Sequence, residues 1–100
     1  MAMGSYQVYP PDLTSDACCT QLEHRFGMTP AEARIGIHLP LGLTDKEIAS
    51  QCGRQLATVK AQVARILLRT GATTRSGAAS IVVATLWARH TLHPDHRIAG

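Results

Sequence analysis

The sequence predicts an all-α fold. Apolar residues recur three or four positions apart in several segments, which is the spacing that places them on one face of a helix. No segment shows the sustained alternation of apolar and polar residues that marks a half-buried strand. Two segments begin with threonine followed three positions later by glutamate, a common helix start. With 100 residues, 45% hydrophobic and 17% charged, the chain fits one small folded domain rather than a disordered segment or a multi-step enzyme.

The chain begins with a tail that leads into a short helix. Two consecutive prolines near the N-terminus cannot continue a helix, so we expect residues 1–12 to form a tail. The apolar residues that follow at helical spacings are Leu13, Cys18, Leu22 and Phe26. We therefore expect a short amphipathic helix within 13–27, capped by Thr14 or Ser15 and ended by Gly27.

The next helix has a clear start. Thr29 can cap it, Pro30 has the fixed φ that suits the first helical position, and Glu32 can reach back to the cap N–H. A proline in the last turn removes one backbone hydrogen bond. We therefore expect this helix to kink or end near Leu39, before the segment closes at Gly42.

Two helices follow, separated by a short turn. Thr44 and Glu47 form a second capping box, and Gly53 ends that helix after about two turns. The next helix spans 55–70 and starts at Gln55, a weaker cap than serine or threonine. Its inward stripe is Leu56, Val59, Val63, Ile66 and Thr70, and its opposite face holds Ala57, Thr58, Ala61, Ala64, Arg65 and Leu68.

The last helix, over about 76–90, is apolar nearly all round and therefore needs two packing partners. Val83 and Trp87 lie one turn apart on its less core-like face. Either a second copy of the chain covers them in a two-fold dimer, or they pack against residues 13–26. We favour the dimer because exposed apolar patches usually mark interfaces, and Leu68 would join whichever contact forms.

Charge is distributed unevenly along the chain. The whole chain has a formal net charge of +3, but the stretch 29–75 carries seven basic and three acidic side chains, a net +4. No acidic residue lies between Glu47 and Asp95. A field of one sign favours a polyanionic partner, although a solvated basic face without a ligand would carry the same charges.

The helices at 46–52 and 56–69, with a tight glycine-containing turn between them, predict a helix-turn-helix. The major groove of DNA is about 12 Å wide and admits one helix, so an inserted helix face must be narrow and either uncharged or basic. Small side chains on the outer face of the second helix allow this close approach. The cations that can reach phosphates on either side are Lys46, Arg54, Lys60, Arg65 and Arg69.

Five blocks of the sequence keep the spacing of one known family. The blocks are Met28-Thr29-Pro30-Ala31-Glu32-Ala33-Arg34, Gly42-Leu43-Thr44-Asp45-Lys46-Glu47-Ile48-Ala49, Thr58-Val59-Lys60, Ile66 and Thr70-Gly71. Together they resemble the DNA-binding domain of LuxR/FixJ-type bacterial transcription regulators over about residues 26–90. The resemblance implies a four-helix domain in which the third helix reads DNA and the fourth helps to form a dimer.

The resemblance also implies roles for individual residues. It places Lys60, Ala61 and Ala64 at base-facing positions. It places Thr44, Lys46, Thr58 and Gln62 at or beside the positions that contact the DNA backbone, and it gives Glu32 a structural role. Alanine cannot make bidentate contacts to a base. Direct readout would therefore rest on Lys60, with Gln62 as a second candidate, and we expect modest sequence specificity.

No catalytic or metal-binding constellation emerges. Three C-terminal histidines recur every three residues, but a proline interrupts them and no second cluster lies nearby, so we expect a tail rather than a metal site. These histidines are His90, His93 and His96. Neither a metal nor another cofactor is expected.

The cysteines have an ordinary interpretation. Cys18 and Cys19 have an acidic rather than a basic neighbour in sequence, so we expect buried or half-buried thiols rather than redox sensors. Cys52 lies on the inward stripe of its helix as a small core residue. We expect His38 to pack at the surface or at an edge.

The prediction is thus an all-α, four-helix LuxR-type helix-turn-helix domain with an extra N-terminal helical or irregular segment. The expected division is a tail or linker at 1–27 that can include a short helix, the DNA-binding domain at 28–90 and a tail at 91–100. We expect a bacterial transcription regulator, or the output domain of one, that binds double-stranded DNA as a homodimer through its last helix. Helix 55–70 would enter the major groove. No signal peptide or membrane span is expected, so we expect a cytoplasmic protein.

Two alternatives stay open. The first is a protein-interaction module that keeps the helical scaffold but has lost DNA reading, which the smooth apolar strip of Ala61, Ala64 and Leu68 motivates. The second is a promoter-recognition piece similar to a sigma factor, which uses a related helix-turn-helix. An enzyme is the least favoured class.

Overall fold

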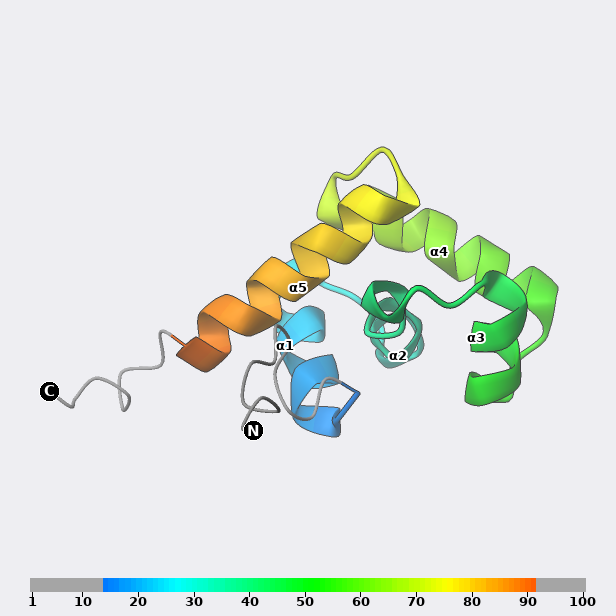
Figure 1. The fold of residues 1–100 in the computed structure, drawn as a ribbon, viewed down its shortest axis with the longest axis horizontal. Coiled ribbons are helices and arrows are strands. Elements are labelled where there is room, and N and C mark those ends of the chain that lie inside the picture. Colours follow the sequence, from blue (N-terminus) through cyan, green and yellow to red (C-terminus); the bar gives the residue numbers. More distant parts are fainter. Residues whose placement is uncertain (1–13, 92–100) are drawn as a thin grey trace, which may run out of the picture.

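A computed structural model describes residues 14–91, which form five α-helices and one short 3₁₀ turn, without a strand in that range (Figure 1). The elements in chain order are α1 (Asp16–Phe26), α2 (Pro30–Gly36), η2 (Leu39–Leu41), α3 (Asp45–Cys52), α4 (Leu56–Thr70) and α5 (Arg75–Thr91). The all-α prediction is confirmed for this part of the chain. The expected tail at 1–12 lies outside the described residues, and so do Leu13 and, in the expected C-terminal tail, His93 and His96. No helix within 14–91 has both the length and the apolar run needed to cross a membrane.

The helix starts follow the caps that the sequence predicts. Ser15, rather than Thr14, caps α1, and its hydroxyl accepts an N–H of the first turn at 3.3 Å. Capping boxes start α2 and α3, where Thr29 and Thr44 each accept the N–H of the glutamate three residues later at 3.1 Å. In contrast, Gln55 makes no side-chain hydrogen bond at the start of α4. The first turn of α4 is therefore the least firmly capped of these four starts.

Helix α2 ends earlier than the sequence predicts. It stops at Gly36 instead of near Leu39, and the 3₁₀ turn η2 follows. If the α-helix continued, the ring of Pro40 would clash with the carbonyl of Gly36, and the same ring disfavours a helical conformation at Leu39. Gly36 also packs closely, since a β-carbon there would lie 3.5 Å from the Leu22 side chain of α1.

The core receives side chains from every α-helix. Helix α2 contacts α1, α3 and α4, and α5 crosses the molecule to contact α1, η2 and α4 (Figure 1). The largest fully buried side chains are Leu22, Ile35, Ile37, Ile48, Val59, Ile66, Val82 and Leu86. Because Leu22 is among them, and Cys18 and Cys19 are also buried, α1 belongs to the same core as the other helices.

The inward stripe of α4 is confirmed at its centre but not at its start. Val59, Val63 and Ile66 are buried, and Thr70 is half-buried. Leu56, which the stripe also places inward, is 40% exposed, so the prediction is wrong at this position. Leu56 is the first residue of α4, so no earlier residues of the helix cover its side chain.

His38 is buried, which contradicts the expected surface or edge position. Its Nδ1 lies 2.7 Å from the carbonyl oxygen of Arg34. Because a carbonyl can only accept, Nδ1 carries the proton and donates, which satisfies one polar atom of the ring inside the fold. Cys52 is half-buried and packs against the core, as predicted, with its Sγ 3.9 Å from the same Nδ1.

Candidate nucleic-acid interface

Most of the residues predicted to contact DNA are exposed and lie at the N-cap of α3, on α3, on α4 or in the turn between these two helices. This set consists of Thr44, Lys46, Arg54, Thr58, Lys60, Ala61, Ala64 and Arg65. Two predicted members differ. Gln62 is half-buried, and Arg69 is held by a buried carboxylate. The structure therefore gathers the basic and small side chains of the helix-turn-helix and separates two residues from them.

All three acidic side chains in the basic stretch 29–75 are engaged by neighbours. Glu32 pairs with Arg69 at 2.5 Å, and Asp45 pairs with Arg75. The Glu47 carboxylate accepts the backbone N–H of the α3 cap at 2.8 Å. Within this stretch, the exposed cations that form no ion pair with another described residue are Lys46, Arg54 and Lys60. Arg34, Arg65, Arg69 and Arg75 each form an ion pair, so the unpaired positive charge at the surface of this stretch is that of these three side chains.

Glu32 is a buried charge that fastens α2 to α4. Its side chain is 3% exposed and accepts hydrogen bonds from Arg69 Nε and Nη2 at 2.5 and 3.5 Å and from the Thr29 N–H at 3.1 Å. Arg65 Nη1 lies 4.0 Å away. Burial alone raises the pKa of the Glu32 carboxyl, but the bonds from Arg69 and Thr29 and the nearby positive charges outweigh it and hold this pKa below its ordinary value. Glu32 is therefore ionised at neutral pH.

This arrangement gives Arg69 a contact inside the fold that the sequence does not predict. Its side chain is only 32% exposed, and two of its nitrogens bond to Glu32. A buried carboxylate needs a cation close by, because an unpaired charge in the interior is strongly destabilising. Arg69 thus belongs with the interior pair, whereas Arg65, one turn earlier on α4, is 66% exposed.

Arg75 connects the start of α5 to the loop that leads into α3. Its guanidinium bonds to the Asp45 carboxylate and, at 2.7 Å, to the Leu43 carbonyl oxygen. Thr44 lies between these two partners, and its hydroxyl accepts the Glu47 N–H. The hydroxyl hydrogen of Thr44 is not used by that bond, so it can donate to a phosphate. Sequence reasoning missed the Arg75 contact because its partners lie 30 and 32 positions away in the chain.

Gln62 is placed less favourably than Lys60 for reading a base. Its Oε1 is buried and has no hydrogen-bond partner among the described residues. That oxygen is therefore shielded from solvent, whereas Lys60 is exposed. Of the two residues proposed for direct readout, Lys60 is the one that the fold presents outward.

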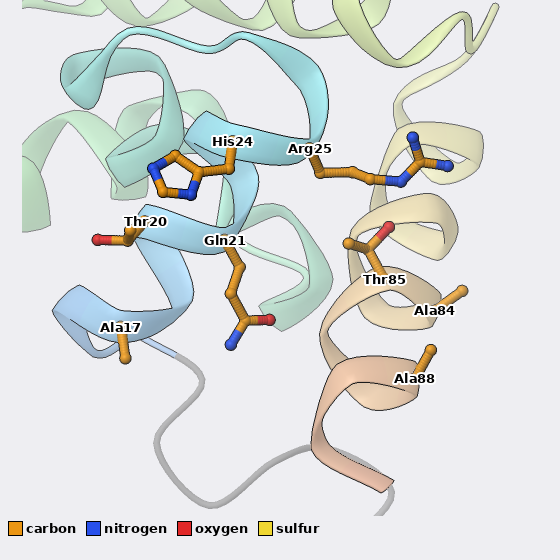
Figure 2. Close-up of a pocket in the computed structure, with 8 residues that line it drawn as sticks. All are labelled: Ala17, Thr20, Gln21, His24, Arg25, Ala84, Thr85 and Ala88. Carbon is orange, nitrogen blue, oxygen red and sulfur yellow. The ribbon is translucent and has the colours of Figure 1, made fainter. Parts of the chain in front are cut away.

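Helix α5 packs within the chain and still exposes part of its apolar surface. It contacts α1, yet Val83 is only half-buried and Trp87 is 39% exposed. A groove separates the outer edges of α1 and α5 (Figure 2). Its lining consists of Ala17, Thr20, Gln21, His24 and Arg25 from α1 and Ala84, Thr85 and Ala88 from α5. Val83 and Trp87 are not part of this lining, so they form a separate apolar surface on α5.

Within residues 14–91, no three His, Cys, Asp or Glu side chains lie close enough together to hold a metal ion. Comparison of the chain with protein families, with curated proteins and with solved structures finds no match. The candidate interface therefore rests on the geometry and charge of α3 and α4 and on the sequence blocks quoted above.

Proposed function

We propose that the protein binds double-stranded DNA, with α4 in the major groove and the start of α3 on the phosphate backbone. The observation that carries this proposal is the composition of α4. Its exposed side consists mainly of lysine, arginine, threonine and alanine, and the whole helix, Leu56–Thr70, contains no Asp or Glu. A polyanion approaching this face meets no carboxylate on the helix.

The packing of α4 supports the proposal. Val59, Val63 and Ile66 fix one face of the helix in the core, and Arg69 fixes its last turn to Glu32. A recognition element works best when rigid parts of the fold hold its contacting side chains in place. The face opposite the core is then presented as a fixed surface to the groove.

The proposed readout is mostly electrostatic. Lys60 is the one long basic side chain at the base-facing positions, and Ala61 and Ala64 offer only methyl groups, which can contact thymine methyls. Lys46 and Arg65 would contact phosphates on the two flanks of α4. Affinity would therefore depend strongly on salt, and sequence specificity would be modest.

A second copy of the chain would complete the arrangement. In the proposed homodimer, the Val83 and Trp87 surfaces of two α5 helices face each other and space the two α4 helices by about one DNA turn, 34–36 Å. With the resemblance to LuxR/FixJ-type domains, this makes regulation of transcription in the bacterial cytoplasm the proposed role.

Fluorescence anisotropy with a mixed-sequence duplex of about 25–30 base pairs, long enough for two half-sites, tests the proposal. The logarithm of affinity should fall linearly with the logarithm of salt concentration. Lys46→Ala and Arg65→Ala should each lower the slope by about 0.9 per half-site and weaken all sequences alike. Lys60→Ala should cost about 1–3 kcal/mol of binding free energy and relax sequence preference.

Arg25→Ala is the matched control, because it removes an exposed cation from α1 rather than from α3 or α4. It should leave the salt slope unchanged. Absence of duplex binding at low salt by the folded protein would refute the proposal. An equal loss of slope in Arg25→Ala would show that the binding is diffuse rather than centred on α4.

A further inference from the structure

Leu68 is an unusually exposed apolar side chain. It is 82% exposed, about twice as much as the other exposed large hydrophobic residues of the described chain. It borders a hollow that α1 and α4 form together. We call this surface the Leu68 patch, and its residues are Phe26, Arg65, Leu68 and Arg69. Phe26 packs against the core from one side and leaves part of its ring at the patch.

The Leu68 patch is ringed by positive charge. Arg65 and Arg69 line it, and the Arg25 guanidinium lies 5.3 Å from the centre of the Phe26 ring. The carboxylate that pairs with Arg65 and Arg69 is that of Glu32, which is buried. A partner therefore meets an apolar centre with cations around it.

DNA does not fit this combination well. Leu68 follows Lys60 by eight residues, which places it about 12 Å further along the helix axis, toward the end that leaves the groove. Phosphates could pair with the arginines, but they would lose hydration against Leu68 and Phe26 without gaining a hydrogen bond there. An apolar side chain on the partner is needed to cover the centre of the patch.

A second copy of the chain does not fit it either. A two-fold interface places each surface against itself, so the arginines of one patch would face those of the other. The described chain also offers few carboxylates to relieve that repulsion, because Asp16, Glu32 and Asp45 each pair with an arginine of their own chain. The chemistry of the patch instead calls for a different chain with acidic side chains.

We propose that the Leu68 patch docks an acidic segment of another protein, in which a large apolar side chain is flanked by Asp or Glu. The apolar side chain would cover Leu68 and Phe26, and the flanking carboxylates would pair with Arg65 and Arg25. Charge-assisted bonds of this kind fix the register of a segment, whereas the buried apolar contact supplies most of its affinity. The docking goes beyond the proposed DNA binding, with which it shares Arg65.

Three matched fluorescein-labelled peptides test the proposal by anisotropy. The first carries a Trp-Leu centre flanked by glutamates, the second has lysines in place of the glutamates, and the third has serines in place of the Trp-Leu centre. The first peptide should bind at least tenfold more tightly than the other two. Leu68→Ser should weaken its binding roughly tenfold to a hundredfold, as expected for losing a buried leucine contact. Arg65→Gln should weaken it and lower its salt dependence.

Leu41→Ser is the matched control, since Leu41 is also an exposed leucine, 44% exposed, but lies in η2 outside the patch. It should leave peptide binding unchanged, with folding of each variant checked by circular dichroism. Equal binding of the glutamate and lysine peptides, or an unchanged affinity in Leu68→Ser, would overturn the proposal. The proposal would also be overturned if Leu68→Ser converted a wild-type dimer to a monomer, or if Leu68→Ser weakened duplex binding as much as Arg65→Gln does. These two results would assign the patch to a second copy or to DNA.

Discussion

Replacing Arg69 with methionine would measure how much the guanidinium of Arg69 stabilises the buried carboxylate of Glu32. Methionine keeps much of the apolar stem of arginine and removes the guanidinium. Glu32 would lose its two bonds from Arg69, at 2.5 and 3.5 Å, and keep the Thr29 N–H at 3.1 Å. Arg65, at 4.0 Å, would be the closest remaining cation in the described chain.

The expected cost follows from the geometry of the pair. Removing one partner of a fully buried ion pair costs about 3–5 kcal/mol of unfolding free energy. Glu32 is buried, but the Arg69 side chain is 32% exposed, so water already weakens the interaction on that side. We therefore expect a loss of about 2–3 kcal/mol, which is in the range of lost hydrogen bonds to a charged group. For a domain of this size, the melting temperature should fall by about 10–20 °C.

Urea denaturation followed by circular dichroism, repeated from pH 7 down to pH 4, gives a second readout. In the wild type the pKa of Glu32 is lowered from its ordinary value of 4.5, so its contribution is complete above that pH and is lost as the pH falls through the folded-state pKa. In Arg69→Met, the Thr29 N–H and Arg65 still lower this pKa, but the loss of both Arg69 contacts lets burial raise it relative to the wild type. The variant's deficit should therefore be largest at pH 7 and shrink as Glu32 becomes protonated.

Arg65→Met serves as the control, because Arg65 is 66% exposed and lies 4.0 Å from the same carboxylate. Its cost should be less than about 0.5 kcal/mol. A loss in Arg69→Met no larger than in Arg65→Met would refute the interior ion pair. A deficit that does not change between pH 7 and pH 4 would contradict the pKa argument even if the loss itself were large.

Three further predictions use simpler measurements. Gln55→Ser supplies the cap that α4 lacks and should raise the unfolding free energy by about 0.5–1 kcal/mol, whereas no gain would show that the turn prevents capping. Gly53→Ala puts a β-carbon at φ +65° with nothing within 4 Å, so backbone strain alone should cost about 1–2 kcal/mol, and a neutral result would contradict that φ. Burial raises the pKa of the Cys19 and Cys52 thiols, so iodoacetamide should label both slowly at pH 7 until urea unfolds the protein. Mass spectrometry measures the labelling, and rapid labelling of the folded protein would contradict this prediction.

The parts of the fold that short-range signals determine could be predicted from the sequence. The boxes at Thr29 and Thr44 involve residues three positions apart, and the structure places both helix starts there. The stop at Gly53 is equally local, since its φ of +65° lies in the left-handed region that other residues disfavour. The sequence predicts the end of α2 too late, near Leu39, because Pro40 also clashes with the carbonyl of Gly36, four residues earlier, where the helix ends.

The parts that depend on distant residues could not be predicted in this way. Arg69 and Glu32 are 37 positions apart, so spacing on α4 marked Arg69 as one more basic residue on a flank. Only the fold shows that a buried carboxylate lies next to it. His38 similarly looked like an edge residue, because nothing in the pattern reveals that the Arg34 carbonyl accepts its proton inside the fold.

The structure of α4 also bears on how such a protein could change its target. The side chains that hold the helix in the fold, Val59, Val63 and Ile66, alternate with exposed ones such as Lys60 and Ala64 that have little part in the core. Substitutions at exposed positions of this kind usually change stability by no more than about 0.5 kcal/mol. Mutation could therefore explore new recognition surfaces on α4 while the scaffold stays folded, and a library randomised at the outward positions would be a starting point for retargeting the domain.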